Sequence, residues 1–157
     1  GHTIIKRSGI LDVEWCRNEH FDLAVSYTYT HIIKQPVIDA LNGNIVNLHI
    51  SFIPYNRGTY PNIWSILEGT PRGVTLHYID AGIDSGDIIA QEFVELEDED
   101  TLFTSYVRLG EAAERLFKDA FKYYPYWNGL RKKVQSKGTF HNDKQFHNLQ
   151  KQESRIL

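Results

Sequence analysis

The chain has 157 residues, of which 41% are hydrophobic and 13% aromatic, so we expect a single folded unit with one core. Its formal net charge of -3 argues against a dedicated nucleic-acid-binding protein, because affinity for a phosphate backbone comes mainly from clustered Lys and Arg. No stretch has the roughly 20 apolar residues of a membrane span, and the single Cys16 cannot form an internal disulfide. We therefore expect a cytoplasmic protein with no membrane or nucleic-acid partner.

The first part of the chain predicts alternating helices and strands. Apolar residues recur at helical spacing over residues 10–19, where Cys16 is typical of a small core residue. Residues 22–27 form a short apolar run, typical of a strand that is buried on both sides. A short helix over 36–41 leads to a second apolar run over 45–50. A strand, a helix and a strand in this order predict a right-handed parallel crossover and hence an α/β domain.

The middle of the chain predicts another helix and a pair of strands. Residues 61–68 have a proline in the first turn, and Gly69 follows the last turn, as is typical of a helix. Residues 73–80 and 87–96 read as strands joined by a glycine-containing loop, so we expect them to form an antiparallel pair.

A long amphipathic helix is predicted over residues 98–124, which Asp100 or Thr101 can cap and Pro125 ends. Its apolar face is formed by Leu102, Tyr106, Leu109, Ala113, Leu116, Phe117, Ala120 and Phe121. The polar residues 126–157 show little periodicity, and we expect them to form an extended tail or a segment lying on the surface.

Two polar side chains, Asn47 and His49, lie two residues apart in the second predicted strand, so both point to the same face near its carboxyl end. Ligands in open α/β sheets bind at the carboxyl ends of strands. Asp84 follows in the acidic loop 81–87. An amide, an imidazole and a carboxylate can polarise, protonate and deprotonate a carbonyl group during acyl transfer. The spacing of Asn47 and His49 alone leaves open a hydrogen-bonded pair that organises the following loop.

These three residues belong to a longer pattern. In chain order it comprises Asn47-x-His49-x-Ser51, Pro54, Arg57-Gly58, Gly73-Val74-Thr75-x-His77, Asp84-x-Gly86-x-Ile88 and Gln91. The pattern resembles the signature of the formyl-tetrahydrofolate-dependent formyltransferases. This resemblance implies a Rossmann-like formyltransferase fold with a mostly parallel sheet and an antiparallel edge pair. It also implies formyl-tetrahydrofolate as co-substrate.

Two further segments resemble one subgroup of that family. Residues 56–65 resemble the Asn-Arg-Gly, Pro-Asn and Trp-Ser pattern of enzymes that formylate nucleotide-linked amino sugars, and residues 137–141 resemble the Gly-Thr-Tyr-His element after their catalytic domain. Methionyl-tRNA formyltransferases differ after the Arg-Gly and carry a separate C-terminal tRNA-binding domain, for which this chain has no room. We therefore expect formyl transfer to the primary amine of a nucleotide-linked amino sugar. A methionyl-tRNA formyltransferase-like activity, another folate-dependent formyltransferase or hydrolase, and an inactive remnant that only binds or self-associates remain alternatives.

The resemblance assigns catalytic roles to Asn47, His49 and Asp84. The Asn47 amide and a protonated His49 would donate hydrogen bonds to the oxyanion that forms when an amine attacks the formyl carbon. Asp84 would favour the cationic imidazole and accept the proton of the amine, while His49 passes a proton to the departing folate nitrogen.

The resemblance also implies binding positions for the two substrates. Those that match the pterin pocket are Thr30, His31, Ile32, Ile33, Asp80 and Gly82, although either Ile alone is equally typical of a core. Tyr60 and Asn62 lie where the acceptor would enter, and His77 is expected to support the active-site loop. A metal site built from His49, His77 and Asp84 matches no compact zinc motif, and the family needs no metal, so none is expected.

The start of the chain departs from the family pattern. Family members have a strand, a helix and a second strand before the segment that begins at Phe21, whereas this chain has 20 residues there, begins Gly-His and contains no Met. We expect residues 1–125 to form an N-terminally truncated catalytic domain that lacks its first strands, followed by a C-terminal extension over 126–157. Exposed sheet edges would then favour self-association into a homo-oligomer. The other expected partners are small molecules, namely the folate donor and the amino-sugar nucleotide.

Overall fold

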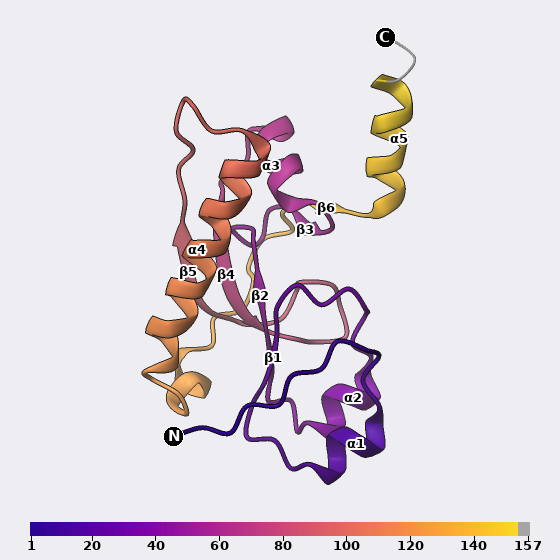
Figure 1. Cartoon of the computed structure of the whole chain (residues 1–157), viewed down its shortest axis with the longest axis vertical. Helices are drawn as coiled ribbons and strands as arrows, with labels where there is room; N and C mark the ends of the chain where they lie inside the picture. The colour runs from indigo at the N-terminus through magenta and orange to yellow at the C-terminus, as the bar shows by residue number, and fades with distance from the viewer. Residues whose placement is uncertain (154–157) are drawn as a thin grey trace.

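The computed structural model describes residues 1–153, which form helices packed on a mixed sheet (Figure 1). In chain order the elements are α1 (Val13–Asn18), β1 (Ala24–Ser26), α2 (Gln35–Ala40), β2 (Ile45–His49), β3 (Arg57–Gly58), α3 (Pro61–Glu68), β4 (Gly73–Tyr78), β5 (Ile88–Phe93), α4 (Leu102–Phe121), the 3₁₀ helix η1 (Tyr126–Leu130), β6 (Phe140–His141) and α5 (Asp143–Glu153). The expected helices and strands before residue 125 are confirmed within a few residues at their ends.

The main sheet has the strand order β1-β2-β4-β5, and a second small sheet pairs β3 with β6. β1 and β2 are parallel, as the strand-helix-strand pattern predicts, and β4 and β5 form the expected antiparallel pair. β2 and β4 are also antiparallel, because β4 begins beside the end of β2, with Thr75 opposite His49. Within the described residues the parallel part of the sheet is therefore confined to β1 and β2.

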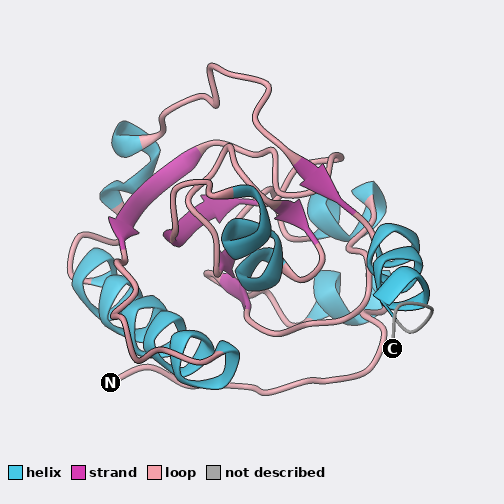
Figure 2. Ribbon diagram, turned by 90° about the horizontal axis from the view of Figure 1, so that it is seen from above, coloured by secondary structure: helices cyan, strands magenta, loops and turns pink. Residues whose placement is uncertain are grey.

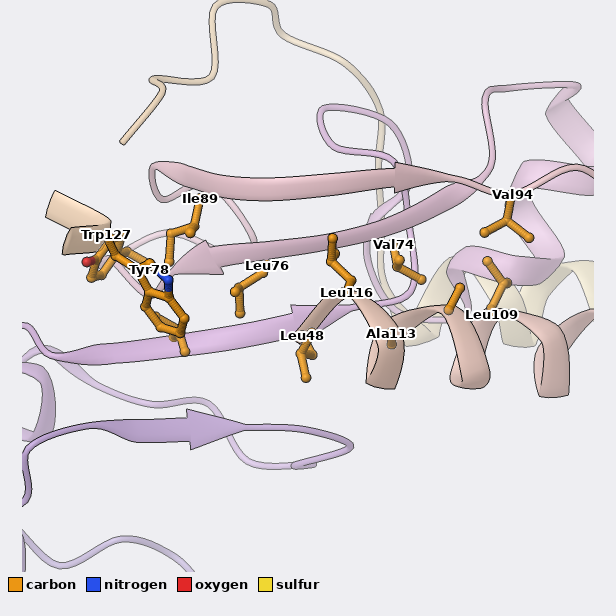
Figure 3. Close-up of a cluster of buried hydrophobic side chains, with 12 residues drawn as sticks. Leu48, Val74, Leu76, Tyr78, Ile89, Val94, Leu109, Ala113, Leu116 and Trp127 are labelled. Atoms are coloured by element: carbon orange, nitrogen blue, oxygen red, sulfur yellow. The ribbon is translucent and has the colours of Figure 1, made fainter. Parts of the chain in front are cut away.

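The main core lies between α4 and one face of the sheet (Figure 3). Figure 3 shows Leu48 and Leu76 on the strands and Leu109 and Leu116 on the helix, all members of this cluster. Burying side chains of this size contributes roughly 1.5 to 3 kcal/mol each. Thr101 begins the helix, because its hydroxyl accepts a hydrogen bond from the Thr104 amide at 3.1 Å.

Two positions of the predicted apolar face of α4 were wrong. Leu102 and Tyr106 are 54% and 48% exposed, because the first turns of α4 face α3 with Ser105, which accepts a hydrogen bond from Asn62. The buried face instead includes Ala112.

A second apolar cluster packs α1 and α2 against the other face of β2. It contains Cys16, Val37, Ile38, Leu41 and Ile45, so the expectation that Cys16 is a core residue is confirmed. Since side chains alternate along a strand, Ile45, Asn47 and His49 share the face of β2 that is turned away from α4.

β1 differs from the strand buried on both sides that its apolar sequence predicts. Val25 is 43% exposed, because β1 is the edge of the sheet and only β2 pairs with it among the described residues. An edge strand leaves one row of backbone groups without strand partners.

Of the two expectations for the residues after Pro125, the described residues form a segment lying on the rest of the molecule, not an extended tail. They contain η1, β6 and α5, and β6 pairs in parallel with β3 (Figure 1). Figure 2 shows the helix that leads to the C-terminus. Ring contacts hold this segment on the rest of the molecule: His141 stacks on Trp64 at 4.1 Å and Phe146 on Tyr60 at 4.0 Å between ring centroids. Residues 154–157 of the expected extension lie outside the described residues. In the part of the chain that the structure describes, no helix is long and apolar enough to cross a membrane.

Candidate active site

A cavity of about 990 Å³ opens beside the sheet. Its walls come from β1 and the loop after it, from the ends of β2 and β4, from the loop before β5, from β3 and the start of α3, from Tyr106 of α4, and from β6 and the first residues of α5. Asn47 and His49 reach it from β2, His77 from β4, and Asp84 from the loop between β4 and β5. The three predicted catalytic residues therefore line one cavity.

The Asp84 carboxylate is the centre of the polar contacts in this cavity. Its Oδ1 accepts a hydrogen bond from Asn47 Nδ2 at 3.2 Å and lies 3.5 Å from His77 Nε2. Its Oδ2 accepts from the main-chain amide of Gly58 at 2.9 Å and lies 3.5 Å from His49 Nε2. The expected proximity of Asp84 to His49 is therefore confirmed.

Asp84 is ionised in this arrangement. Burial alone would raise the pKa of its carboxyl group, but His49, His77 and the Gly58 amide together lower that pKa well below its usual range. Ionisation is therefore maintained by the neighbouring imidazoles and by the hydrogen bond from the main chain.

His49 is buried, and its protonation state differs from the expected one. Burial lowers the pKa of the imidazole more than the attraction of Asp84 raises it, so the ring is neutral near pH 7. Its Nε2 lies 3.2 Å from the main-chain carbonyl oxygen of Asn56, which can only accept, so Nε2 carries the proton. The free protein therefore favours a neutral His49, whereas the role that the resemblance implies uses the protonated ring; that role stays a prediction.

His77 lies beside Asn47 and Asp84. Its Nδ1 donates to the main-chain oxygen of Tyr78 at 2.8 Å. Its Nε2 lies 3.5 Å from Asp84 Oδ1 and 3.4 Å from Asn47 Nδ2. The Asn47 amide nitrogen is thus in contact with two protein side chains, Asp84 and His77.

The predicted binding positions fall into two groups. The six pterin positions all line this cavity, and so does Tyr60; the six are Thr30, His31, Ile32, Ile33, Asp80 and Gly82. Asn62 is buried outside the cavity lining, where its amide donates to Ser105 Oγ at 2.9 Å and to the Leu102 carbonyl at 3.2 Å. The prediction that Asn62 contacts an acceptor is not supported, since its side chain connects α3 to α4.

Sequence reasoning missed the main-chain groups of Asn56 and Gly58, which bond to His49 and Asp84. It also missed the contribution of residues 140–144 to the cavity wall, although the motif at 137–141 marked that segment. Among residues 1–153 there is no group of three or more His, Cys, Asp or Glu placed to hold a metal ion.

Comparison with known proteins identifies relatives that share this arrangement of elements. The family described as Formyl transferase matches residues 13–121, which include Asn47, His49 and Asp84. The crystal structure of PseJ from Anoxybacillus kamchatkensis has a TM-score of 0.79 and 38% identity, covering 90% of this chain and 75% of that chain. That structure contains UDP-4,6-dideoxy-4-formamido-L-AltNAc and tetrahydrofolate. The expected Rossmann-like formyltransferase fold is therefore confirmed.

Two curated relatives differ in the acceptor that their names give. The dTDP-4-amino-4,6-dideoxyglucose formyltransferase of Mycobacterium bovis is 37% identical over 103 residues, which are 66% of this chain and 43% of that protein. The methionyl-tRNA formyltransferase of Fusobacterium nucleatum is 35% identical over 111 residues, 70% of this chain and 36% of that protein. The chain thus spans less than half the length of these relatives. With most of its described residues inside the match, the chain belongs to the formyl transferase family.

Proposed function

We propose that the chain transfers a formyl group from formyl-tetrahydrofolate, its co-substrate, to the primary amine of a nucleotide-linked amino sugar. The observation that carries this proposal is the convergence of Asn47, His49 and Asp84 on one cavity, with the Asp84 carboxylate in contact with both partners. The amino-sugar acceptor is favoured over tRNA because the likeness to PseJ, whose structure holds a formamido sugar nucleotide, extends over 90% of this chain.

The cavity fits two substrates of this size. Its volume is at the upper end of the roughly 300 to 1,000 Å³ typical of small-molecule sites. Ile32 and Ile33 offer apolar surface for a flat pterin, while Asp80 and the Gly82 main chain offer polar groups. Tyr60 lies on the opposite part of the lining, near the C-terminal segment, where we place the acceptor.

We assign the proton acceptor to His49 rather than to Asp84, and the directions of the two pKa shifts support this choice. A carboxylate whose pKa is held well below its usual range is a poor base, whereas a neutral imidazole has a free lone pair. His49 Nε2–H is directed to the Asn56 carbonyl, so the lone pair is on Nδ1. The amine nitrogen attacks the formyl carbon, and Nδ1 of His49 takes the proton that the amine loses.

The resulting imidazolium is stabilised by Asp84, whose Oδ2 lies 3.5 Å from Nε2. The proton then passes from His49 to the folate nitrogen as the bond between that nitrogen and the formyl carbon breaks. The products are a formamide and tetrahydrofolate, and His49 returns to its neutral state. Asp84 thus acts through its charge, not as a proton acceptor.

Asn47 is the side-chain donor for the oxyanion of this reaction. One of its amide hydrogens must leave a protein acceptor first, and the 3.4 Å contact with His77 Nε2 is the longer of its two. Oxyanion donors of this kind contribute roughly 3 kcal/mol to lowering the barrier.

The finer expectations on partners and location remain proposals. We retain the cytoplasm as the setting, small molecules as substrates, residues 1–125 as the catalytic unit, and a homo-oligomer as the assembly. The exposed edge of β1 supports self-association, and sedimentation at two protein concentrations tests it.

One assay with three acceptors tests the function. The protein is incubated with formyl-tetrahydrofolate and either a UDP- or dTDP-linked amino sugar, methionyl-tRNA or water alone. We expect a formamido sugar nucleotide, and no product with His49→Gln. Formylation of methionyl-tRNA or simple hydrolysis would support one of the alternatives. Thermal stabilisation by folinic acid without any turnover would identify a binding remnant.

A further inference from the structure

The small β3–β6 sheet lies directly behind the catalytic residues. Two main-chain groups at β3 contact them: the Asn56 carbonyl oxygen, 3.2 Å from His49 Nε2, and the Gly58 amide, 2.9 Å from Asp84 Oδ2. One of these contacts sets the imidazole tautomer and the other helps to ionise the carboxylate. The position of β3 therefore determines the state of both side chains.

Asn56 is fixed in place by one side chain of the C-terminal segment. Its main-chain amide donates to Thr139 Oγ1 at 2.7 Å, and the Thr139 hydroxyl donates to Asn56 Oδ1 at 3.2 Å. The remaining amide group of the side chain donates to Thr70 Oγ1 at 2.6 Å. Asn56 is fully buried, so no solvent replaces these partners.

Gly58 is fixed by the pairing of the two strands. The Arg57 amide donates to the Thr139 carbonyl at 3.1 Å and the Thr59 amide to the His141 carbonyl at 3.0 Å. Gly58 has a φ of 92°, and a Cβ there would lie 2.1 Å from the His141 carbonyl oxygen. Only glycine permits β6 to approach β3 this closely.

We propose that Thr139 is a positioning residue for formyl transfer, which holds the Asn56 carbonyl against His49 and thereby keeps the proton of the neutral imidazole on Nε2. Residues 138–141 of the C-terminal extension then assist the catalytic unit formed by residues 1–125, although they lie outside the family match at 13–121. The consequence for turnover rests on the proposed function. The consequence for the His49 tautomer rests only on the hydrogen bonds.

Removing the Thr139 hydroxyl releases two of the contacts that hold Asn56, whereas the bond from the Arg57 amide to the Thr139 carbonyl and the bond from the Asn56 side chain to Thr70 remain. With part of its support lost, the Asn56 carbonyl shifts relative to His49, so the share of the Nε2–H tautomer falls and Nδ1 is no longer always the lone-pair atom. The pKa of His49 also falls further, because the bond to Asn56 raises it. Misplacement of a catalytic group by about 1 Å can lower turnover on the order of 100-fold.

The test is ¹⁵N NMR of histidine-labelled protein, with the resonances of His49 assigned by comparison with His49→Gln. Thr139→Val keeps the shape of the side chain and loses the hydroxyl, whereas Thr139→Ser keeps the hydroxyl. Thr101→Val makes the same chemical change at the cap of α4, at a residue that does not line the cavity. We expect Nε2–H in the wild type, Thr139→Ser and Thr101→Val, and a mixture of tautomers with a lower pKa in Thr139→Val.

An unchanged His49 tautomer and pKa in Thr139→Val would overturn the proposal, and so would a wild-type His49 that carries its proton on Nδ1. Thr139→Ala provides the same readout if the valine variant does not fold. Turnover is measured in parallel, with a 10- to 100-fold loss expected for Thr139→Val and recovery in Thr139→Ser. A wild type without formyl transfer would contradict the proposed function and leave the tautomer result to decide the role of Thr139.

Discussion

At the residue scale, the site depends on a carboxylate in an uncommon backbone conformation. Asp84 has a φ of 47°, a left-handed conformation that few residues other than Gly, Asn and Asp adopt readily. Asn56 and Tyr60 share this feature, with φ of 53° and 55°. Such conformations persist where surrounding contacts hold them, and the four contacts of Asp84 do so.

Asparagine at position 84 tolerates the left-handed conformation, so Asp84→Asn is expected to fold, while it loses the charge and one of the two oxygens that accept from Asn47 and Gly58. Without that charge the imidazolium of His49 is not stabilised, and kcat should fall on the order of 100-fold or more, with little change in the Kd for folinic acid. Asp119→Asn makes the same change on the exposed surface of α4 and should leave kcat intact. Equal kcat values for Asp84→Asn and wild type would exclude a catalytic charge.

The lowered pKa of His49 predicts how stability depends on pH. The unfolded chain binds a proton at about pH 6.5 and the folded chain only at lower pH. This contribution to the free energy of unfolding is therefore complete above about pH 6.5 and is lost as the pH falls through the folded pKa. Urea unfolding at pH 8, 6.5 and 5 should show a smaller loss of stability in His49→Gln than in wild type. Parallel losses would contradict a buried neutral imidazole.

At the element scale, the sequence predicts those helices and strands that are marked by the spacing of apolar residues and by Gly or Pro at their ends. α3 ends where Gly69 follows it, and the parallel pair β1 and β2 follows from the strand-helix-strand order. β6 has two residues, too few for any period, and α5 has few apolar side chains, so both were missed. Among the site residues, Asn47, His49 and Asp84 are marked by their chemistry. The groups that hold them are the main-chain carbonyl of Asn56 and the main-chain amide of Gly58. The sequence does not mark such groups, because every residue has a main chain.

The turn between β4 and β5 allows one sharp test of packing. A Cβ on Gly86 would lie 1.9 Å from the Tyr78 carbonyl oxygen, so Gly86→Ala must displace the loop that carries Asp84. We expect a loss of about 1 to 3 kcal/mol in the free energy of unfolding, measured in urea. Gly129 has no atom within 4 Å of its added Cβ, so Gly129→Ala should change stability by less than about 0.5 kcal/mol. Similar values for the two variants would refute the close packing of this loop.

At the scale of the whole molecule, the cavity gathers residues from nearly the full length of the chain. Its lining runs from Ser26 in β1 to Lys144 in α5, with the sheet between them. A ligand that fills it should therefore stabilise the entire fold, because the ligand contacts several elements at once.

Folinic acid at 100 times its Kd should add about 2.7 kcal/mol to the free energy of unfolding. Ile32→Ser and Ile10→Ser form a matched pair for this measurement, because the two side chains are 75% and 73% exposed and only Ile32 lines the cavity. We expect Ile32→Ser to raise the Kd about 10-fold by removing apolar contact with the pterin, while Ile10→Ser has no effect. Identical Kd values, from calorimetric titration, would place the pterin elsewhere.

The pairing of β3 with β6 also has a consequence for the order in which the protein becomes active. Asn56 and Thr139 are 83 positions apart, and contacts of such long separation close slowly during folding. During synthesis, His49 and Asp84 leave the ribosome long before the residues that orient them. If the chain has the proposed activity, this activity is expected only once β6, the last strand of the described residues, has joined β3. A growing chain that has completed its main sheet holds the chemical groups of the site but not yet their alignment.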